Sequence, residues 1–413
     1  MSDERTATWL SGFKADYQKV FVEPWSPYTG AVMLVLVVTA VLISGLFWGV
    51  FGGLKHWGDW INHLIGLDAL LGARHELDSP LMHRISLMDI TLILGAFAAA
   101  LMSRQFILNR APAIEYVWGA LGGIFMGLGA TVAGGCTVGG FFVPVLHASP
   151  AGMVMWGGLV VGALVGLKLL MWTMEHIQWG TQPPAVLKVP ERVQRLYPVL
   201  GLILIGAILW WTYAWYGAAD EKTASRAILV ISGFAIGFVM HRSRFCVARA
   251  IREPFMTGEA DMSKAVILAL ALGIPLASLV FQAKLVDPYI GIPPRFWLGS
   301  LLGGVIFGVG MIFAGGCGTG SLWRMGEGHL KLWVAVFFFA WSGSTTSMVM
   351  NRLGWTASVM SLDLIEESSL GYQAFYPVML GGWTWAFLIS GGFLLAWYLL
   401  VRYNQTTERF TLF

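Results

Sequence analysis

Long apolar stretches separated by short polar segments make up most of this chain. Ten of them stand out: 31–53, 88–103, 117–135, 151–175, 196–217, 226–241, 263–283, 296–316, 331–350 and 378–402. A helix of about 20 apolar residues crosses the roughly 30 Å hydrocarbon core of a bilayer. The pattern therefore predicts an all-α polytopic membrane protein with about ten spanning segments. The stretch 54–73 is predicted to form a further, interfacial helix on the outer surface.

Composition and loop charge support this prediction and give an orientation. The chain is 57% hydrophobic and 12% charged, too apolar for a soluble globule, and its net charge of +3 forms no basic patch for nucleic acid. With a cytoplasmic N-terminus and ten crossings, sixteen Lys and Arg residues lie inside and seven outside, leaving aside three at segment edges. This bias follows the positive-inside rule and predicts an inner-membrane protein with both termini cytoplasmic. Loop 351–377 is then an outer loop.

A glycine-rich peptide occurs twice and ends in cysteine both times. LGGIFMGLGATVAGGC ends at Cys136, and LGGVIFGVGMIFAGGC ends at Cys317. Nine of the sixteen positions are identical, and Gly139 and Gly320 extend the match. The chain has only 3 cysteines, so two at equivalent points of an internal repeat indicate a site.

The two copies would cross the membrane in opposite directions, as in the inverted repeats of secondary transporters. We therefore divide the chain into a polar or interfacial lead-in (1–30), a first transmembrane half (31–185), a second half (186–405) and a cytoplasmic tail (406–413). Whether the two motifs cross the bilayer or re-enter from one side stays open.

The glycines beside each cysteine are predicted to break the helix at membrane depth. They are Gly134, Gly135 and Gly139 in the first copy and Gly315, Gly316 and Gly320 in the second. A break inside the membrane is tolerated only within protein or beside a cavity, and glycine lets a ligand approach the backbone closely. The helix that follows could offer amide donors to an anion. The earlier glycines, 122 to 129, are expected only to let helices pack closely.

The third cysteine, Cys246, stands in HRSRFCVARAIREPFMTG among four arginines. It is either a small buried hydrophobe or a reactive thiol in a basic setting, and the sequence leaves both possibilities open. Arg244 is a possible accessory residue of the site. Arg324 and Glu327, just past the second motif, either attract substrate or form an ion pair, and we favour the ion pair.

These motifs resemble the YeeE/YedE family of sulfur-compound transporters, most closely its longer YedE-like members. The match rests on 244–246 (Arg-Phe-Cys), 315–320 (Gly-Gly-Cys-x-Thr-Gly) and 324–328 (Arg-x-x-Glu-Gly), and it covers most of the chain from about residue 30. The resemblance implies thiosulfate uptake through an hourglass-shaped protein with its narrow point at the cysteines. By motif, Cys136, Cys246 and Cys317 would handle the sulfur compound, and a cytoplasmic carrier protein of the TusA type would be a partner. Some YedE-like members are linked to selenium metabolism, so the resemblance also implies a selenium-bearing compound as an alternative substrate.

Physical reasoning favours passage of the intact anion. Burying an unpaired dianion is costly, so its path must offer donors along its length. A neutral thiol is a weak donor that can hand an anion onward without trapping it. In an alternative relay, a thiolate, with Cys246 the best candidate, takes sulfane sulfur as a persulfide, releases sulfite and passes the sulfur (or selenium) to a cytoplasmic carrier.

Two further alternatives remain. A soft-metal carrier could use thiols and some of the 19 methionines, although no Cys-x-x-Cys is present. A membrane thiol-redox enzyme would need Cys136 and Cys317 within about 6 Å of each other. The sequence predicts a transporter rather than an enzyme, with no cofactor and no resident metal.

Overall fold

The computed structural model describes residues 11–12, 14–72, 77–176, 185–187, 189–292, 298–354 and 375–412. In chain order its elements are η1 (Gln18–Val22), α2 (Pro27–Ile43), α3 (Phe51–Leu64), α4 (Leu67–Leu71), α5 (Arg84–Met102), β1 (Leu108–Arg110), α6 (Ala113–Ala133), η2 (Thr137–Phe142), α7 (Val143–Leu146), α8 (Pro150–His176), β2 (Ala185–Leu187), α9 (Glu191–Tyr216), α10 (Glu221–Ser243), α11 (Val247–Met256), α12 (Asp261–Gln282), α13 (Leu298–Ala314), α14 (Gly318–Glu327), α15 (Leu330–Arg352), α17 (Tyr376–Met379) and α18 (Trp383–Thr407).

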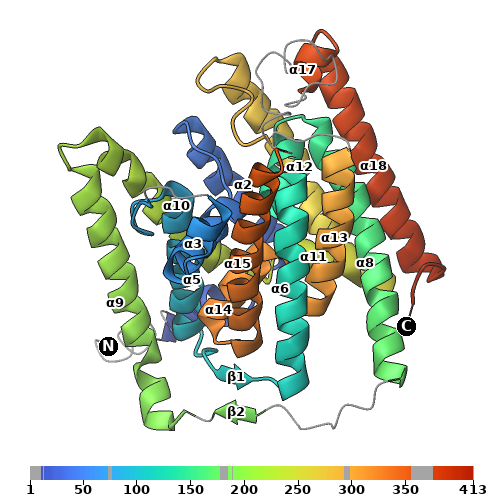
Figure 1. Ribbon diagram of the computed structural model, residues 1–413. Coiled ribbons are helices and arrows are strands. Elements are labelled where there is room, and N and C mark those ends of the chain that lie inside the picture. Colours follow the sequence, from blue (N-terminus) through green and yellow to red (C-terminus); the bar gives the residue numbers. More distant parts are fainter. Residues whose placement is uncertain are drawn as a thin grey trace.

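The protein is a bundle of long apolar helices, as predicted (Figure 1). Within the described residues, 9 helices are long and apolar enough to cross a membrane, or up to 10 if η1 and α2, bent by 79°, form one broken span. Each of the ten predicted stretches overlaps one of these candidates. A short antiparallel ribbon interrupts the helices, with Leu108 of β1 opposite Leu187 of β2. The chain is a multi-pass membrane protein.

Two predictions at the start of the chain need correction. Stretch 31–53 is not one helix: α2 ends at Ile43, Gly45 takes a left-handed conformation with φ of 71°, and α3 begins only at Phe51. A left-handed glycine ends a helix, which a count of apolar residues does not register. The interfacial helix predicted within 54–73 is also wrong, because α3 is packed into the bundle. A Cβ at Gly58 would lie within 1.9 Å of the Ala340 carbonyl oxygen of α15.

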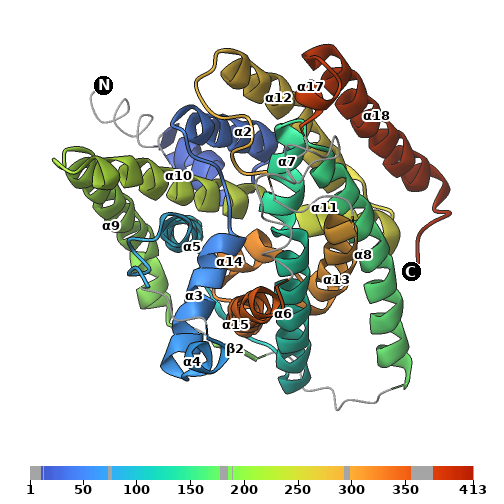
Figure 2. The same ribbon diagram turned by 45° about the horizontal axis from the view of Figure 1, so that its top comes forward.

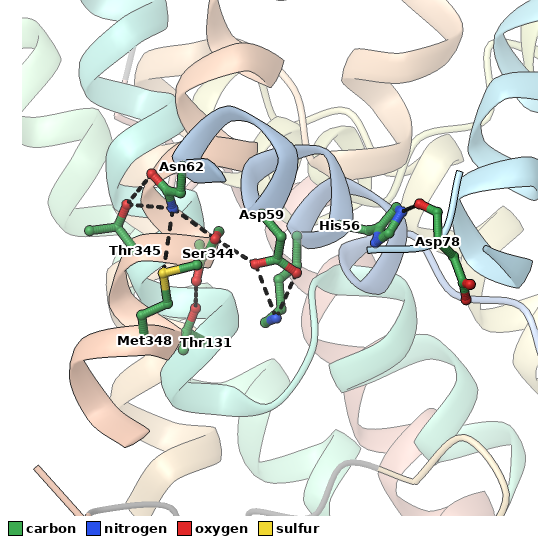
Figure 3. Close-up of polar contacts among 10 residues, drawn as sticks. His56, Asp59, Asn62, Asp78, Thr131, Ser344, Thr345 and Met348 are labelled. Carbon is green, nitrogen blue, oxygen red and sulfur yellow. Dashed lines mark hydrogen bonds and ion pairs between the residues drawn. The ribbon is translucent and has the colours of Figure 1, made fainter. Parts of the chain in front are cut away.

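Side-chain hydrogen bonds join the polar face of α3 to α15 (Figure 3). Asn62 donates to the hydroxyl of Ser344 at 2.8 Å, and Ser344 donates to Asp59 at 2.6 Å. Asp59 also pairs with Lys55 at 3.0 Å. The carboxylate and the amide are therefore satisfied within the protein, and the bonds to Ser344 hold the C-terminal half of α3 against α15.

The glycine repeats form the contact between α6 and α13. A Cβ at Gly122 would meet the backbone of Ala314 and Gly310 at 2.3 and 2.7 Å, and one at Gly129 would meet that of Phe307 and Gly303 at 2.4 and 2.6 Å. Early residues of α6 thus lie against late residues of α13, so the two copies pack antiparallel. The close-packing role expected for these glycines is confirmed at this contact.

The remaining repeat glycines pack against the long helix that comes after the other copy's cysteine. Gly123 and Gly127 of α6 pack against α15, whereas Gly304 and Gly308 of α13 pack against α8. Equivalent positions of the two copies therefore carry out equivalent packing, which is the arrangement that an inverted repeat requires.

Helices α9 and α18 lie at the two edges of the bundle (Figure 1). Only 17% of the most apolar window of α9 is buried and 28% of that of α18, against 72% for α5. Large apolar side chains such as Trp210, Tyr213 and Leu388 project outward from these edge helices, as suits contact with lipid.

The division of the chain at residues 30, 185 and 405 stays a prediction. Residues 1–10 of the predicted lead-in and residues 355–374 of the predicted outer loop lie outside the described residues.

Candidate functional site

Each of the three cysteines begins a helix directly after a left-handed turn. Cys136 is the N-cap of η2, Cys246 of α11 and Cys317 of α14. Two residues before each cysteine the backbone has a positive φ: 79° at Gly134, 54° at Arg244 and 84° at Gly315. The Ala-Gly-Gly-Cys sequence is thus a helix end followed at once by a helix start, which confirms the predicted breaks. Arg244 adopts the same conformation without being glycine.

Backbone amides of the new helices surround the sulfur atoms. The first N–H groups of a helix have no intrahelical partner and carry partial positive charge. Gly320 N lies 3.4 Å from Cys317 Sγ. The amides of Val138 and Gly139, together with that of Phe51 at the start of α3, are directed at the Cys136 thiol. These amides provide the donors that an anion beside the thiols would need.

The first turn of α14 brings the three thiols together. The position of a Cβ on Gly318 lies 3.6 Å from Cys136 Sγ. A Cβ on Gly320 would lie 3.0 Å from Cys246 Sγ and 3.3 Å from Cys317 Sγ. All three cysteines are buried and free of disulfides. The structure therefore gathers the predicted site residues around α14, and it places Cys246, which the sequence left open, beside Cys317.

Two cavities flank these thiols. The first, here called the glycine cavity, has a volume of about 310 Å³ and is lined by Gly134, Gly135 and Gly139 with residues of 47–52 and 289–292. The second, the basic cavity, has about 530 Å³ and includes Gly315 in its wall. The glycine cavity lies where α6 ends and the chain leads into α13, and the basic cavity where α6 begins and α13 ends. They therefore open at opposite ends of this helix pair, and no cysteine lines either of them.

The cavities differ in charge. Among the described residues, no charged side chain lines the glycine cavity. Arg252, Arg324 and Lys331 line the basic cavity, with Glu115 as its acidic residue. Lys331 and Glu115 form an ion pair. The two arginines keep this cavity favourable for an anion. Arg252 and Lys331 were not among the predicted site residues, although Arg252 lies six positions after Cys246.

The expected ion pair between Arg324 and Glu327 is wrong. Glu327 instead accepts a 2.6 Å hydrogen bond from Arg244 and lies 3.6 and 3.4 Å from ring nitrogens of His241 and His329. Arg324 donates to the carbonyl of Gly315 at 3.1 Å. Residues three apart lie on the same face of a helix, but here each side chain has a different partner. Arg324 therefore contacts the glycine break, whereas Glu327 joins the end of α14 to the end of α10.

Comparison with known proteins identifies the family. A sequence model described as "Sulphur transport" matches residues 4–165 and 242–411, which include all three cysteines. The chain belongs to this sulphur-transport family, the YeeE/YedE family. The unmatched residues contain the edge helix α9 and most of α10. The family assignment makes the protein a transporter of sulfur compounds.

Several curated relatives support this assignment. The chain is 29% identical to the "Probable transporter YedE" of Salmonella typhimurium over 330 residues, 76% of this chain and 79% of the relative. The YedE of Escherichia coli is 28% identical over 75% of this chain and 77% of its own length. The "Thiosulfate transporter TsuA" of Spirochaeta thermophila is 30% identical over 173 residues, 40% of this chain and 52% of that protein.

Proposed function

We propose that this protein imports thiosulfate, or a closely related small sulfur anion, along its three buried thiols. The observation that carries the proposal is the gathering of Cys136, Cys246 and Cys317 around the first turn of α14, between two cavities that open at opposite ends. The names of the TsuA relatives support thiosulfate as the substrate.

The anion would enter through the glycine cavity. Because its described lining has no charged side chain, the donors that this lining offers are backbone N–H groups, among them those directed at Cys136. An arginine at this point would hold a dianion tightly, whereas amides and a thiol bind it weakly enough for onward movement. Gly134, Gly135 and Gly139 leave the backbone open to such an approach.

At the narrow point the anion would pass from Cys136 to Cys246 and Cys317. The sulfur atoms of Cys246 and Cys317 border the same small space beside Gly320. A thiol that points its S–H at the anion is a weak donor, and a thiolate would repel it. Arg252 and Arg324 then draw the anion into the basic cavity.

We place the glycine cavity outside the cell and the basic cavity inside. This orientation rests on the loop charges, puts both termini in the cytoplasm and assigns the protein to the inner membrane. A TusA-like carrier protein would then receive the sulfur at the basic cavity.

One observation keeps the persulfide relay as a second candidate. The Cys246 thiol has a second thiol, Cys317, beside it. A Cys246 thiolate would attack the sulfane sulfur of thiosulfate and form a persulfide S–S bond with it. The sulfur–sulfur bond of thiosulfate would break at the same time, and sulfite would leave with the electron pair of that bond. Cys317 could then take the sulfane sulfur onward by the same exchange. The thiol-redox alternative, in contrast, required Cys136 rather than Cys246 as the neighbour of Cys317.

Thiosulfate labelled separately on its two sulfur atoms distinguishes these candidates. Liposomes that contain the purified protein receive each labelled form, and the label trapped inside is counted. Passage of the intact anion predicts equal entry of both labels. The relay predicts that the sulfane label binds to Cys246 while the sulfonate label leaves as sulfite. Wild-type liposomes that take up neither label would contradict the proposed function itself.

A further inference from the structure

Asp89 is a carboxyl group that the transport path described above does not use. It lies in the second turn of α5, a candidate membrane span, and is 0% exposed. Neither carboxyl oxygen has a hydrogen-bond partner within the described part of the chain. The other buried carboxyl groups described, Asp68, Glu253 and Glu327, each have a partner. Asp89 is the exception among them.

The backbone of α3 lies directly against this carboxyl group. A Cβ on Gly53 would stand 2.1 Å from Asp89 Oδ2 and 2.8 Å from the backbone of Ser86. Only glycine therefore leaves room for the side chain at this contact. Figure 2 shows α3, α5 and α14 side by side near the middle of the bundle.

The same end of α3 reaches the cysteine path. The amide of Phe51, two residues before Gly53, is directed at the Cys136 thiol, and Asp89 is close enough to Cys136 to act on it electrostatically. Asp89 and Cys136 thus lie on two sides of the first turn of α3. A charge that arrives at one of them will be felt at the other.

Two cavities approach the turn of α5 that precedes Asp89. Ile85, one turn before it, lines both the glycine cavity and a cavity of about 270 Å³ that also includes Met88 and His83. We call the latter the histidine cavity. Both cavities therefore reach the turn that precedes Asp89, although Asp89 itself lines neither.

The charged groups on the packed elements lie elsewhere. Five elements pack against α5, and each carries charged or titratable residues. They are Lys55, His56, Asp59 and His63 on α3; Glu191, Arg192 and Arg195 on α9; Glu221, Lys222, Arg226, His241 and Arg242 on α10; Arg324 and Glu327 on α14; and Lys19 on η1. None of these side chains bonds to Asp89 in the described structure. Ionisation of a carboxyl group is unfavourable in a buried place without a donor, so the protonation of Asp89 depends on the charge that approaches it.

We propose that Asp89 is a proton-coupling site, at which a proton bound from the outer side accompanies each anion past Cys136 and is released inside with it. The proposal rests on the proposed transport of thiosulfate. The physical basis is linkage: an anion at Cys136 strengthens proton binding at Asp89, and a proton at Asp89 strengthens anion binding at Cys136 to the same degree. When the anion leaves for the basic cavity, this support is lost and the proton follows.

Proton entry is measured directly in liposomes that hold a trapped pH dye, with the membrane potential clamped. In wild type, external thiosulfate is expected to acidify the lumen in step with label uptake, and an inward proton gradient is expected to accelerate uptake. In Asp89→Asn, both effects should be lost, while exchange of internal for external thiosulfate at equal pH continues. The matched control, Asp59→Asn on α3, should still acidify the lumen.

Each outcome bears on a different claim. Wild-type uptake without acidification, or acidification that persists in Asp89→Asn, overturns the coupling role. Absence of thiosulfate exchange in wild type instead overturns the proposed function. If Asp89→Asn is inactive in every assay, labelling of wild type decides: dicyclohexylcarbodiimide, an apolar reagent for protonated carboxyl groups, should modify Asp89 at a rate that thiosulfate increases. Modification that thiosulfate leaves unchanged contradicts the proposal.

Discussion

Replacing Gly320 with alanine tests the narrow point with the smallest possible change. The new methyl group would lie 3.0 Å from Cys246 Sγ and 3.3 Å from Cys317 Sγ. Relaxed contacts between such atoms are near 3.5–4.0 Å, so each sulfur must retreat by roughly 0.5 Å. Overpacking of this kind costs about 1–3 kcal/mol, and alanine recovers up to about 1 kcal/mol in helix propensity. We therefore expect Gly320→Ala to fold with a net loss of at most about 3 kcal/mol.

Its effect on transport should be large even though the protein still folds. The methyl group occupies the space that both thiols border, where the anion must pass. A rise of about 1.4 kcal/mol in the barrier lowers the rate about tenfold, and we expect at least this decrease in the initial rate of thiosulfate uptake.

The assay compares uptake into liposomes with the thermal unfolding midpoint of the same preparations. Gly157→Ala in α8 is the matched control, because a Cβ there would meet nothing within 4 Å. It makes the same chemical change in a membrane helix away from the thiols. Folded Gly320→Ala that transports at the wild-type rate would refute the location of the narrow point.

Three further predictions concern stability. Glu327→Gln should lower the free energy of unfolding by about 1–3 kcal/mol, because Arg244 loses its carboxylate partner while keeping some contact with solvent; an unchanged unfolding midpoint would contradict this. Gly129→Ala should destabilise the α6–α13 contact, since its Cβ would meet the backbone of Phe307 at 2.4 Å, and normal stability with normal uptake would refute the packing argument. Burial, and next the neighbouring His56, lowers the pKa of His83 from 6.5 to about 4, and its ring accepts the Ser86 amide. The stability that neutral His83 contributes is complete above pH 6.5 and decreases as the pH falls towards 4. The unfolding midpoint should therefore fall over this pH range. His83→Asn keeps an acceptor at the N-cap and should reduce that fall.

The helices and their breaks could be predicted because their causes are local. Length and apolar composition determine which segments can span a bilayer, and glycine next to cysteine supplies a helix end and a helix start. The same reasoning failed at 31–53, where one glycine, Gly45, separates two helices within a single apolar stretch. The packing of α3 into the bundle was also missed. Its polar residues contact other helices, but in the sequence they have the same spacing as the exposed polar residues of a surface helix.

The contacts between distant segments could not be predicted from local pattern. Cys246 lies beside Cys317 only because α11 and α14 begin at the same point of the bundle. Glu327 pairs with Arg244 rather than with Arg324 because the end of α10 packs against α14, and helix spacing alone, which places residues three apart on one face, does not predict this contact. Asp89 carried a visible signal, a carboxyl group inside the apolar stretch 88–103, but its lack of a partner became evident only when α3 was placed.

The central claim, that a sulfur anion passes along the three thiols, is tested most directly by labelled thiosulfate uptake in liposomes without any carrier protein. Wild type is compared with Cys136→Ala, Cys246→Ala and Cys317→Ala, each shown to be folded. The account predicts uptake by wild type and a strong decrease in each variant. Uptake that continues at the wild-type rate in folded Cys136→Ala and Cys317→Ala would contradict it.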